Sequence, residues 1–181
     1  MFIYPNIIIY LVYTKLTIST AYLYYNSKSN GILYLKLYIS YIYIYIMLVQ
    51  VLNQLFEYSN NYIAVREDMN LKIPAFSIIE KDIYGRHIPV ILINQKLIPK
   101  NINIIAHILS HEWGHHILQH IQKTPPINMP EPEEIQIKEN EADTYAAHFI
   151  KEYSYDKDDI INFMKDHPFD LDNRLNILCS V

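Results

Sequence analysis

Residues 111–115 have the sequence H-E-W-G-H, in which two histidines stand four positions apart and a glutamate follows the first. On a helix this spacing places both imidazoles on one face, one turn apart, where they can bind one metal ion. Glu112 then projects beside them and can serve as a general base. The motif therefore requires a helix here. It makes His111 and His115 candidate zinc ligands and Glu112 a candidate catalytic residue.

The surrounding sequence also predicts a helix. Residues 102–122 contain no proline, and apolar residues recur at helical spacing, at Ile104, Ile105, Ile108, Leu109, Ile117, Leu118 and Ile121. Gly114 costs about 1 kcal/mol relative to alanine inside a helix, so its presence predicts close approach by another backbone or by substrate. The alternative interpretation is a histidine-rich helix face in solvent.

A catalytic zinc usually has three protein ligands and one open position, so a further ligand is needed. Residues 138–150 again have a helical pattern, and Glu139 and Asp143 share one face of it. Glu139 can then bind the metal while Asp143 accepts a hydrogen bond from the ring of a ligating histidine. Glu141 points about 200° away from Glu139 and is the alternative ligand. A solvated helix face would also explain these acids.

Together, the segments H-E-W-G-H-H-I-L (residues 111–118) and E-N-E-A-D-T-Y-A-A (residues 139–147) resemble the ImmA/IrrE family of metallopeptidases. That family has an H-E-L-G-H helix, followed by E-x-E-A-N or E-x-E-A-D, an aromatic residue and two alanines. The resemblance covers roughly residues 57–178. Here Trp113 replaces the usual leucine and Asp143 stands where asparagine is common, and neither change removes a ligand.

The resemblance implies that Glu139 is the third ligand of one Zn²⁺ ion. It further implies a cytoplasmic zinc metalloendopeptidase whose protein substrate is a helix-turn-helix transcriptional repressor of a mobile element or a stress response. Membrane-bound zinc proteases with an E-x-x-A-D second motif share both signatures and are the competing enzyme class. A zinc-bearing binding or toxin–antitoxin module without hydrolysis is the non-enzymatic alternative.

Composition divides the chain at about residue 47. Residues 1–46 contain eleven of the seventeen tyrosines, and their only charges are Lys15, Lys28 and Lys36. Residues 41–46 alternate Tyr and Ile, as a translated TA repeat would, and end directly before Met47. We hypothesise that residues 1–46 are low-complexity upstream sequence annexed to a domain of residues 47–181.

Two other interpretations of residues 1–46 remain open. One is a membrane anchor formed by residues 7–25 and 32–49, although a lysine near the middle of each costs about 2.5 to 3.5 kcal/mol on insertion scales. That anchor would make the protein membrane-bound. The other is a β-rich segment, because alternation of this kind also fits strands.

Residues 47–181 are enough for one domain with its own core. We expect an α+β, zincin-like fold in which a small antiparallel or mixed sheet packs on the helix carrying H-E-x-x-H, and a second helix carries the third ligand. The expected elements are a helix over residues 47–65, strands over 76–80 and 88–94 joined through Gly85, a proline-rich loop or lid over 123–134, and two short helices on either side of Pro168 within 156–178.

Pro89 suits an edge strand, so residues 90–94 are a hypothetical substrate-binding edge, with an ordinary core strand as the alternative. His107 is expected to pack near the site. His116 and His120 are expected to face away from the ligands, in solvent. The sequence also offers three candidates for stabilising an oxyanion, which are His87, Tyr145 and His167.

Charge and cysteine content restrict the partners. Residues 47–181 contain twelve basic and nineteen acidic residues, a formal net charge of −7 with histidine neutral. Such a domain is a poor direct binder of nucleic acid, since phosphate contacts need clustered Lys and Arg. Cys179 is the single cysteine of the chain, which excludes an intramolecular disulfide and fits a reducing compartment. Membrane contact is expected only if residues 1–46 are genuine.

Overall fold

The computed structural model describes residues 31–122, 130–166 and 170–181, with side chains from residue 42 onward. The chain forms two units, residues 1–49 and 50–181, and their boundary lies within helix α2 (Gly31–Ser59). The candidate site belongs entirely to the second unit.

The Tyr/Ile alternation of residues 41–46 lies within α2, so the β-rich interpretation is wrong for this stretch. Alternation among residues that are all apolar or aromatic does not distinguish a strand from a buried helix. The first expected membrane segment, residues 7–25, lies outside the described residues. In residues 42–122, 130–166 and 170–181, no helix is both long enough and apolar enough to span a membrane.

The helix expected over residues 47–65 ends earlier, at Ser59. Asn60 has a left-handed backbone with φ of 51°, a conformation that asparagine tolerates better than most residues and that commonly terminates helices. The chain then forms β1 (Ala64–Glu67), a strand that the hydrophobic pattern did not predict. A four-residue strand gives too short a pattern to separate from the end of an apolar helix.

The other two strands, β2 (Ala75–Lys81) and β3 (His87–Ile93), form the expected antiparallel hairpin. The sheet has the order β1-β3-β2, and β1 pairs with β3 in parallel, so the sheet is mixed. At the hairpin turn Gly85 has φ of 77°, a conformation that favours glycine.

The prediction that Pro89 marks an edge strand is wrong, because β3 is the central strand. Pairing with β1 begins only at Val90, one residue after Pro89, so β3 has β2 alone as its neighbour at the proline. Residues 90–93 pair on both sides and have no free edge for a peptide. The expected substrate-binding edge at residues 90–94 is therefore also wrong.

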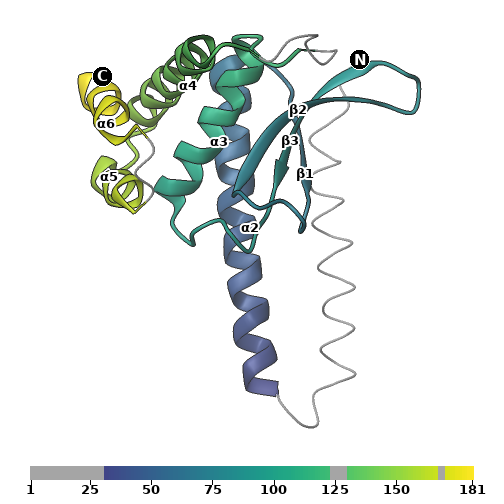
Figure 1. Ribbon diagram of the computed structural model, residues 1–181. Coiled ribbons are helices and arrows are strands. Elements are labelled where there is room, and N and C mark those ends of the chain that lie inside the picture. The colour runs from purple at the N-terminus through teal and green to yellow at the C-terminus, as the bar shows by residue number, and fades with distance from the viewer. Residues whose placement is uncertain (1–30, 123–129, 167–169) are drawn as a thin grey trace. The chain divides into compact units, whose positions relative to one another are not determined.

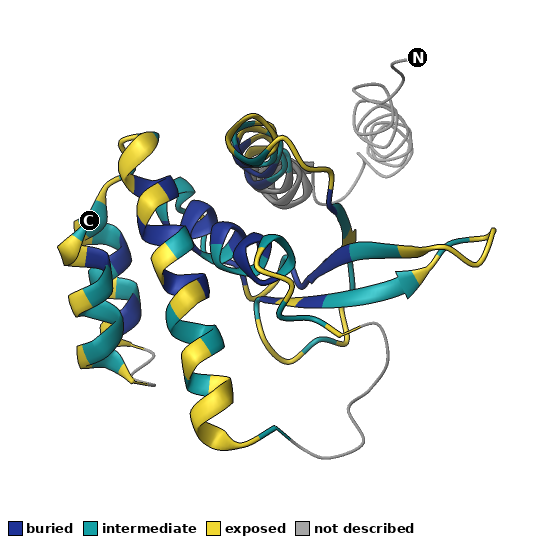
Figure 2. Cartoon of the chain, turned by 90° about the horizontal axis from the view of Figure 1, so that it is seen from above, coloured by how far each residue is buried: buried dark blue, intermediate teal, exposed yellow. Residues whose placement is uncertain are grey.

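Helix α3 (Ile102–Ile117) lies between the sheet and a layer formed by α4 (Pro132–Glu152), α5 (Lys157–Lys165) and α6 (Leu171–Ser180) (Figure 1). The Asn101 side chain caps α3 by accepting hydrogen bonds from the first turn. Figure 2 shows that buried residues concentrate along α3 and on the surfaces that face it. The core of this unit includes Ile91, Ile105, Leu109, Trp113, Phe149 and Ile150.

The α+β class and the packing of the motif helix on a small sheet are thus confirmed, while the zincin-like fold remains a prediction. The two C-terminal helices are confirmed, and Pro168 between them lies outside the described residues. The proline-rich loop is shorter than expected. Pro132 is the first residue of α4, where proline needs no backbone N–H, and residues 123–129 are not described.

Gly114 has a close neighbour, as predicted, but that neighbour is a side chain of α4. A Cβ atom at Gly114 would lie 3.1 Å from Tyr145 Cβ and 3.2 Å from Tyr145 Cδ1. These distances are shorter than ordinary van der Waals contact. Ala142 and Ala146 of α4 are fully buried, so small residues occur on both helices.

We predict that Gly114→Ala acts differently in two backgrounds. With Tyr145→Gly the clash is absent, because the Cβ atom and the ring at position 145 are both removed, and alanine at position 114 should stabilise the helix by about 1 kcal/mol through its higher propensity. With Tyr145 present, steric conflict should cancel or reverse this gain. Urea unfolding of the four proteins measures the coupling. Equal effects of Gly114→Ala in the two backgrounds would show that the contact does not constrain helix packing.

Candidate metal centre

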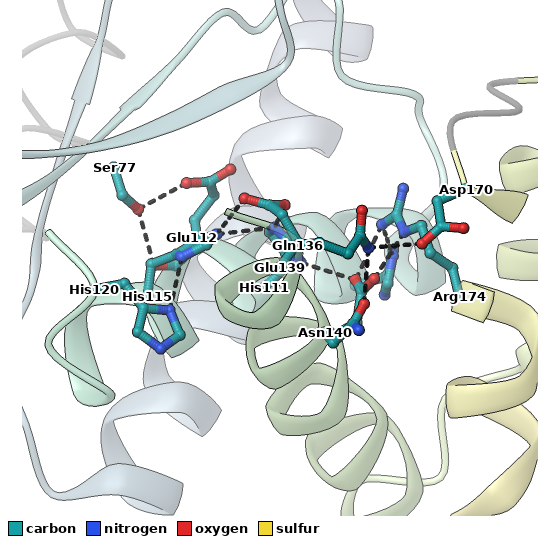
Figure 3. A network of polar contacts seen from close by, with 12 residues as sticks. Ser77, His111, Glu112, His115, His120, Gln136, Glu139, Asn140, Asp170 and Arg174 are labelled. Atoms are coloured by element: carbon teal, nitrogen blue, oxygen red, sulfur yellow. Dashed lines mark hydrogen bonds and ion pairs between the residues drawn. The ribbon is translucent and has the colours of Figure 1, made fainter. Parts of the chain in front are cut away.

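Three side chains from two helices meet where α3 packs against α4. His111 and His115 place their Nε2 atoms 3.1 Å apart. Glu139 of α4 places Oε2 3.3 Å from His111 Nε2 and Oε1 3.5 Å from His115 Nε2. Figure 3 shows these side chains converging. In the described part of the chain, this is the group of His, Cys, Asp and Glu side chains that could hold a metal ion.

The donor atoms of these three residues lie close enough together to bind one metal ion. With ligand bonds of about 2.0 to 2.2 Å, neighbouring donors of a tetrahedral zinc lie about 3.3 to 3.5 Å apart. Here the two histidine nitrogens lie 3.1 Å apart, the 3.3 and 3.5 Å distances end on different oxygens of Glu139, and one donor atom from each residue lies within 4.8 Å of the others. Two imidazoles and one carboxylate also form a ligand set found in catalytic zinc sites, with the fourth position left for water. The site can therefore hold a metal ion.

Asp143 lies where the sequence predicted it, behind the first histidine. Its Oδ1 is 2.9 Å from His111 Nδ1, so it can accept the ring N–H and leave Nε2 for a metal. Arg174 of α6 donates from Nε to Asp143 Oδ2 at 2.8 Å and from an Nη to Oδ1 at 3.1 Å. Burial acts to raise the pKa of Asp143, but hydrogen bonds from His111 and Arg174 outweigh it and lower that pKa.

Beside Arg174, a further polar cluster joins α6 to α4 (Figure 3). Gln136 donates to Asn140 Oδ1 and to Asp170 Oδ2, and Asn173 donates to the same two oxygens. This cluster holds the helix that carries Arg174 against the helix that carries Glu139. No pattern in the sequence indicated a role for Arg174, because the contact depends on how α6 docks.

Glu112 is held from the side of the sheet. The hydroxyl of Ser77, on β2, lies 2.7 Å from Glu112 Oε2 and 2.9 Å from the backbone carbonyl oxygen of Glu112. Burial raises the pKa of Glu112, against the lowering effect of His111 and Ser77. Ser77 was not a candidate from sequence. A polar residue at an inward position of a strand, between Ala75 and Ile79, was the available signal.

The prediction that His120 faces solvent is wrong. Its Nδ1 lies 3.0 Å from Nδ1 of His115, and its Nε2 lies 2.9 Å from Glu141 Oε2. The predicted helix ran to residue 122, but α3 ends at Ile117. Gln119 adopts φ of 59°, and the His120 N–H donates to the His115 carbonyl at 2.9 Å. This is a Schellman-type ending, which turns the chain back toward the site.

The remaining histidines on α3 contact protein groups. His116 faces away from the ligands as expected, but its Nε2 lies 3.1 Å from the Val90 carbonyl oxygen, so it is not simply solvated. His107 is buried and its Nε2 lies 3.4 Å from an Nη of Arg174, in agreement with a packing role beside the site. Burial lowers the pKa of His107 to about 3.

Glu141, the alternative third ligand, bonds to His120 and is not part of the donor cluster. The oxyanion candidates gain no support. The Tyr145 ring lies against Gly114 and packs edge to face on Tyr58, with ring centroids 5.5 Å apart. His87 is exposed at the start of β3, and His167 lies outside the described residues.

The two candidate histidine ligands differ in charge when no metal is bound. Burial acts to lower the pKa of His111, but hydrogen bonds to Asp143 and Glu139 raise it to about 9. Burial and the adjacent positive His111 lower the pKa of His115 to about 4. The hydrogen bond from His111 lowers the pKa of Glu139. At neutral pH His111 is therefore protonated on both ring nitrogens, and a metal ion must displace the proton on Nε2.

Comparisons with protein-family models, with curated proteins and with solved structures return no match.

We predict that metal affinity rises with pH. Below a His111 pKa of about 9, each metal ion bound releases one proton, so the apparent dissociation constant for Zn²⁺ should fall about tenfold per pH unit between pH 6.5 and 8.5. Competition with a chromophoric chelator, corrected for the chelator's own protonation, measures the slope. Asp143→Asn removes the carboxylate that stabilises protonated His111, so the dependence of Zn²⁺ affinity on pH should become weaker. A pH-independent affinity in the wild type would contradict the assignment.

We predict that Arg174→Met destabilises the fold by about 3 kcal/mol. The buried Asp143 carboxylate would then lose its arginine partner and keep only the hydrogen bond with His111. The matched control is Arg66→Met, because Arg66 pairs with Glu80 at the surface and its loss should cost about 1 kcal/mol or less. Denaturant unfolding of the metal-free proteins measures both. Equal losses would mean that the Asp143 contact is no stronger than a surface ion pair.

Proposed function

We propose that the protein is a zinc-dependent metalloendopeptidase that hydrolyses peptide bonds. The observation that carries this proposal is the convergence of His111, His115 and Glu139, next to the half-buried Glu112 on the helix of the two histidines. A structural zinc site usually has four protein ligands, whereas three ligands and a neighbouring general base are typical of catalytic sites. The proposed metal is zinc because two imidazoles and one carboxylate are a ligand set found in catalytic zinc sites.

Zinc, when bound, supplies a Lewis acid that polarises a peptide carbonyl and lowers the pKa of a coordinated water from about 15.7 toward 7. Glu112 accepts the proton of the attacking water on a carboxylate oxygen and then delivers it to the departing amine. The Ser77 hydroxyl holds that carboxylate in one orientation. Asp143, fixed by Arg174, holds the His111 ring with Nε2 toward the metal position.

The outer edge of β2 is the proposed position for an extended substrate. Within the described residues β2 pairs with β3 alone, so its second edge can form main-chain hydrogen bonds with a peptide. Ser77 ties β2 directly to Glu112, so this strand lies beside the proposed catalytic base. A helix-turn-helix repressor as the natural substrate, and a cytoplasmic location, rest on the resemblance to the ImmA/IrrE family.

We predict that Glu112→Gln keeps about one zinc per chain and loses at least about a hundredfold in hydrolysis rate, the lower end of what general-base catalysis contributes. His111→Ala and His115→Ala should lose both zinc and hydrolysis. Metal content by mass spectrometry and cleavage of a quenched fluorescent peptide library are the two measurements. Glu133→Gln, at an exposed position in the first turn of α4, is the matched control and should behave as wild type.

Three outcomes would overturn the proposed function. A folded wild-type protein without zinc would reduce the motif to a histidine-rich helix face. Cleavage by Glu112→Gln at the wild-type rate would remove Glu112 from the chemistry. Stoichiometric zinc without hydrolysis of any peptide would favour the non-catalytic, zinc-bearing module.

A further inference from the structure

His115 has a partner on each of its two ring nitrogens. Nε2 faces His111 and Glu139, and Nδ1 lies 3.0 Å from Nδ1 of His120. His120 in turn places Nε2 2.9 Å from Glu141 Oε2. We propose that His120 and Glu141 are positioning residues for the metal ligand His115, joined to it in a relay of two hydrogen bonds. The inference rests on the proposed metal centre and adds to it a role that the H-E-x-x-H pattern does not contain.

The chemistry of imidazole gives the relay one direction. Metal on Nε2 of His115 leaves that ring's proton on Nδ1, since a neutral imidazole carries one N–H. His115 Nδ1 must therefore donate, and Nδ1 of His120 must accept. The single proton of His120 then lies on Nε2 and is donated to the Glu141 carboxylate. Glu141, which only accepts, selects the tautomer of His120, and His120 selects that of His115.

Burial makes the relay necessary. The His120 side chain is 6% exposed and that of Glu141 is 55% exposed, so the relay starts in the interior and ends at solvent. His115 is also buried. Without an acceptor at His120, the Nδ1–H of His115 would lose its partner in a place with little water, and a buried unpaired donor is costly. The ring would be free to rotate away from the orientation that aims Nε2 at the metal.

The two ligating histidines are thus held by different chemistry. His111 donates to a buried carboxylate that an arginine also holds, whereas His115 donates to a neutral imidazole. A neutral acceptor raises the basicity of the ligand less than a carboxylate does. The orientation of His115 therefore depends on the turn that follows α3, because residues 118–120 place the His120 ring next to His115.

The experiment compares Zn²⁺ affinity by chelator competition in four variants of the full chain. His120→Leu removes the acceptor and should weaken binding about 10- to 100-fold, the usual effect of losing an outer partner. His120→Asn places Oδ1 near the position of Nδ1, so it should restore most of this loss. Glu141→Gln still accepts from His120 and should weaken binding less than His120→Leu does. His148→Gln, at an exposed position on α4, is the control and should match wild type.

A second measurement separates positioning from folding. The visible spectrum of the cobalt-substituted protein reports ligand geometry, and it should change in His120→Leu but not in His120→Asn or His148→Gln. Thermal unfolding of the metal-free proteins shows whether each variant folds. If His120→Leu does not fold, His120→Asn and Glu141→Gln still test the relay, because both must bind zinc more tightly than His115→Ala does and keep the wild-type cobalt spectrum.

The outcomes distinguish this inference from the proposed function. Stoichiometric zinc in wild type with equal affinity and an equal cobalt spectrum in His120→Leu would overturn the relay and leave the peptidase proposal intact. Equal weakening by His120→Asn and His120→Leu would show that the acceptor atom has no role. A wild-type protein that binds no zinc would overturn both.

Discussion

The candidate site depends on the close packing of α3 against α4. The metal ligands come from both helices, and their donor atoms meet only if the helix axes approach closely. Gly114 permits this approach by leaving room for Tyr145. The buried alanines at positions 142 and 146 of α4 have small side chains, which also allow the helices to pack closely. A larger residue at Gly114 would push Tyr145 outward and, with it, the helix that carries Glu139. The packing of the two helices therefore also determines the positions of the metal ligands.

The sequence predicted the parts of the site that depend on one helix. The spacing of His111 and His115 and the shared face of Glu139 and Asp143 follow from 3.6 residues per turn, and the structure brings them together as expected. His120 was misplaced because the helical pattern continued past Ile117, where the backbone had already turned. The end of a helix can depend on the backbone conformation of a single residue, here Gln119. The spacing of apolar residues carries no information about that conformation.

The parts that the sequence missed depend on tertiary docking. Ser77 reaches Glu112 from a strand, and Arg174 reaches Asp143 from the last helix. No spacing rule connects residues so far apart in the chain. The sheet order is a similar case, since β1 is too short to show alternation, and its parallel pairing with β3 places residues 90–93 in the centre of the sheet instead of at an edge. Local pattern thus predicted the ligands and Asp143, and docking supplied Ser77, which orients Glu112, and Arg174, which orients Asp143.

The ligand cluster also has a mechanical consequence. A metal ion held by His115 on α3 and Glu139 on α4 would act as a cross-link that closes the chain between them, including the proline-containing connection. An ion that binds the folded chain but not the unfolded one stabilises the fold by mass action, by about 4 kcal/mol when the free metal is a thousandfold above its dissociation constant. The ion would then stabilise the pairing of the two helices whether or not a substrate is present, and metal loss would loosen the same contact that aligns the catalytic groups.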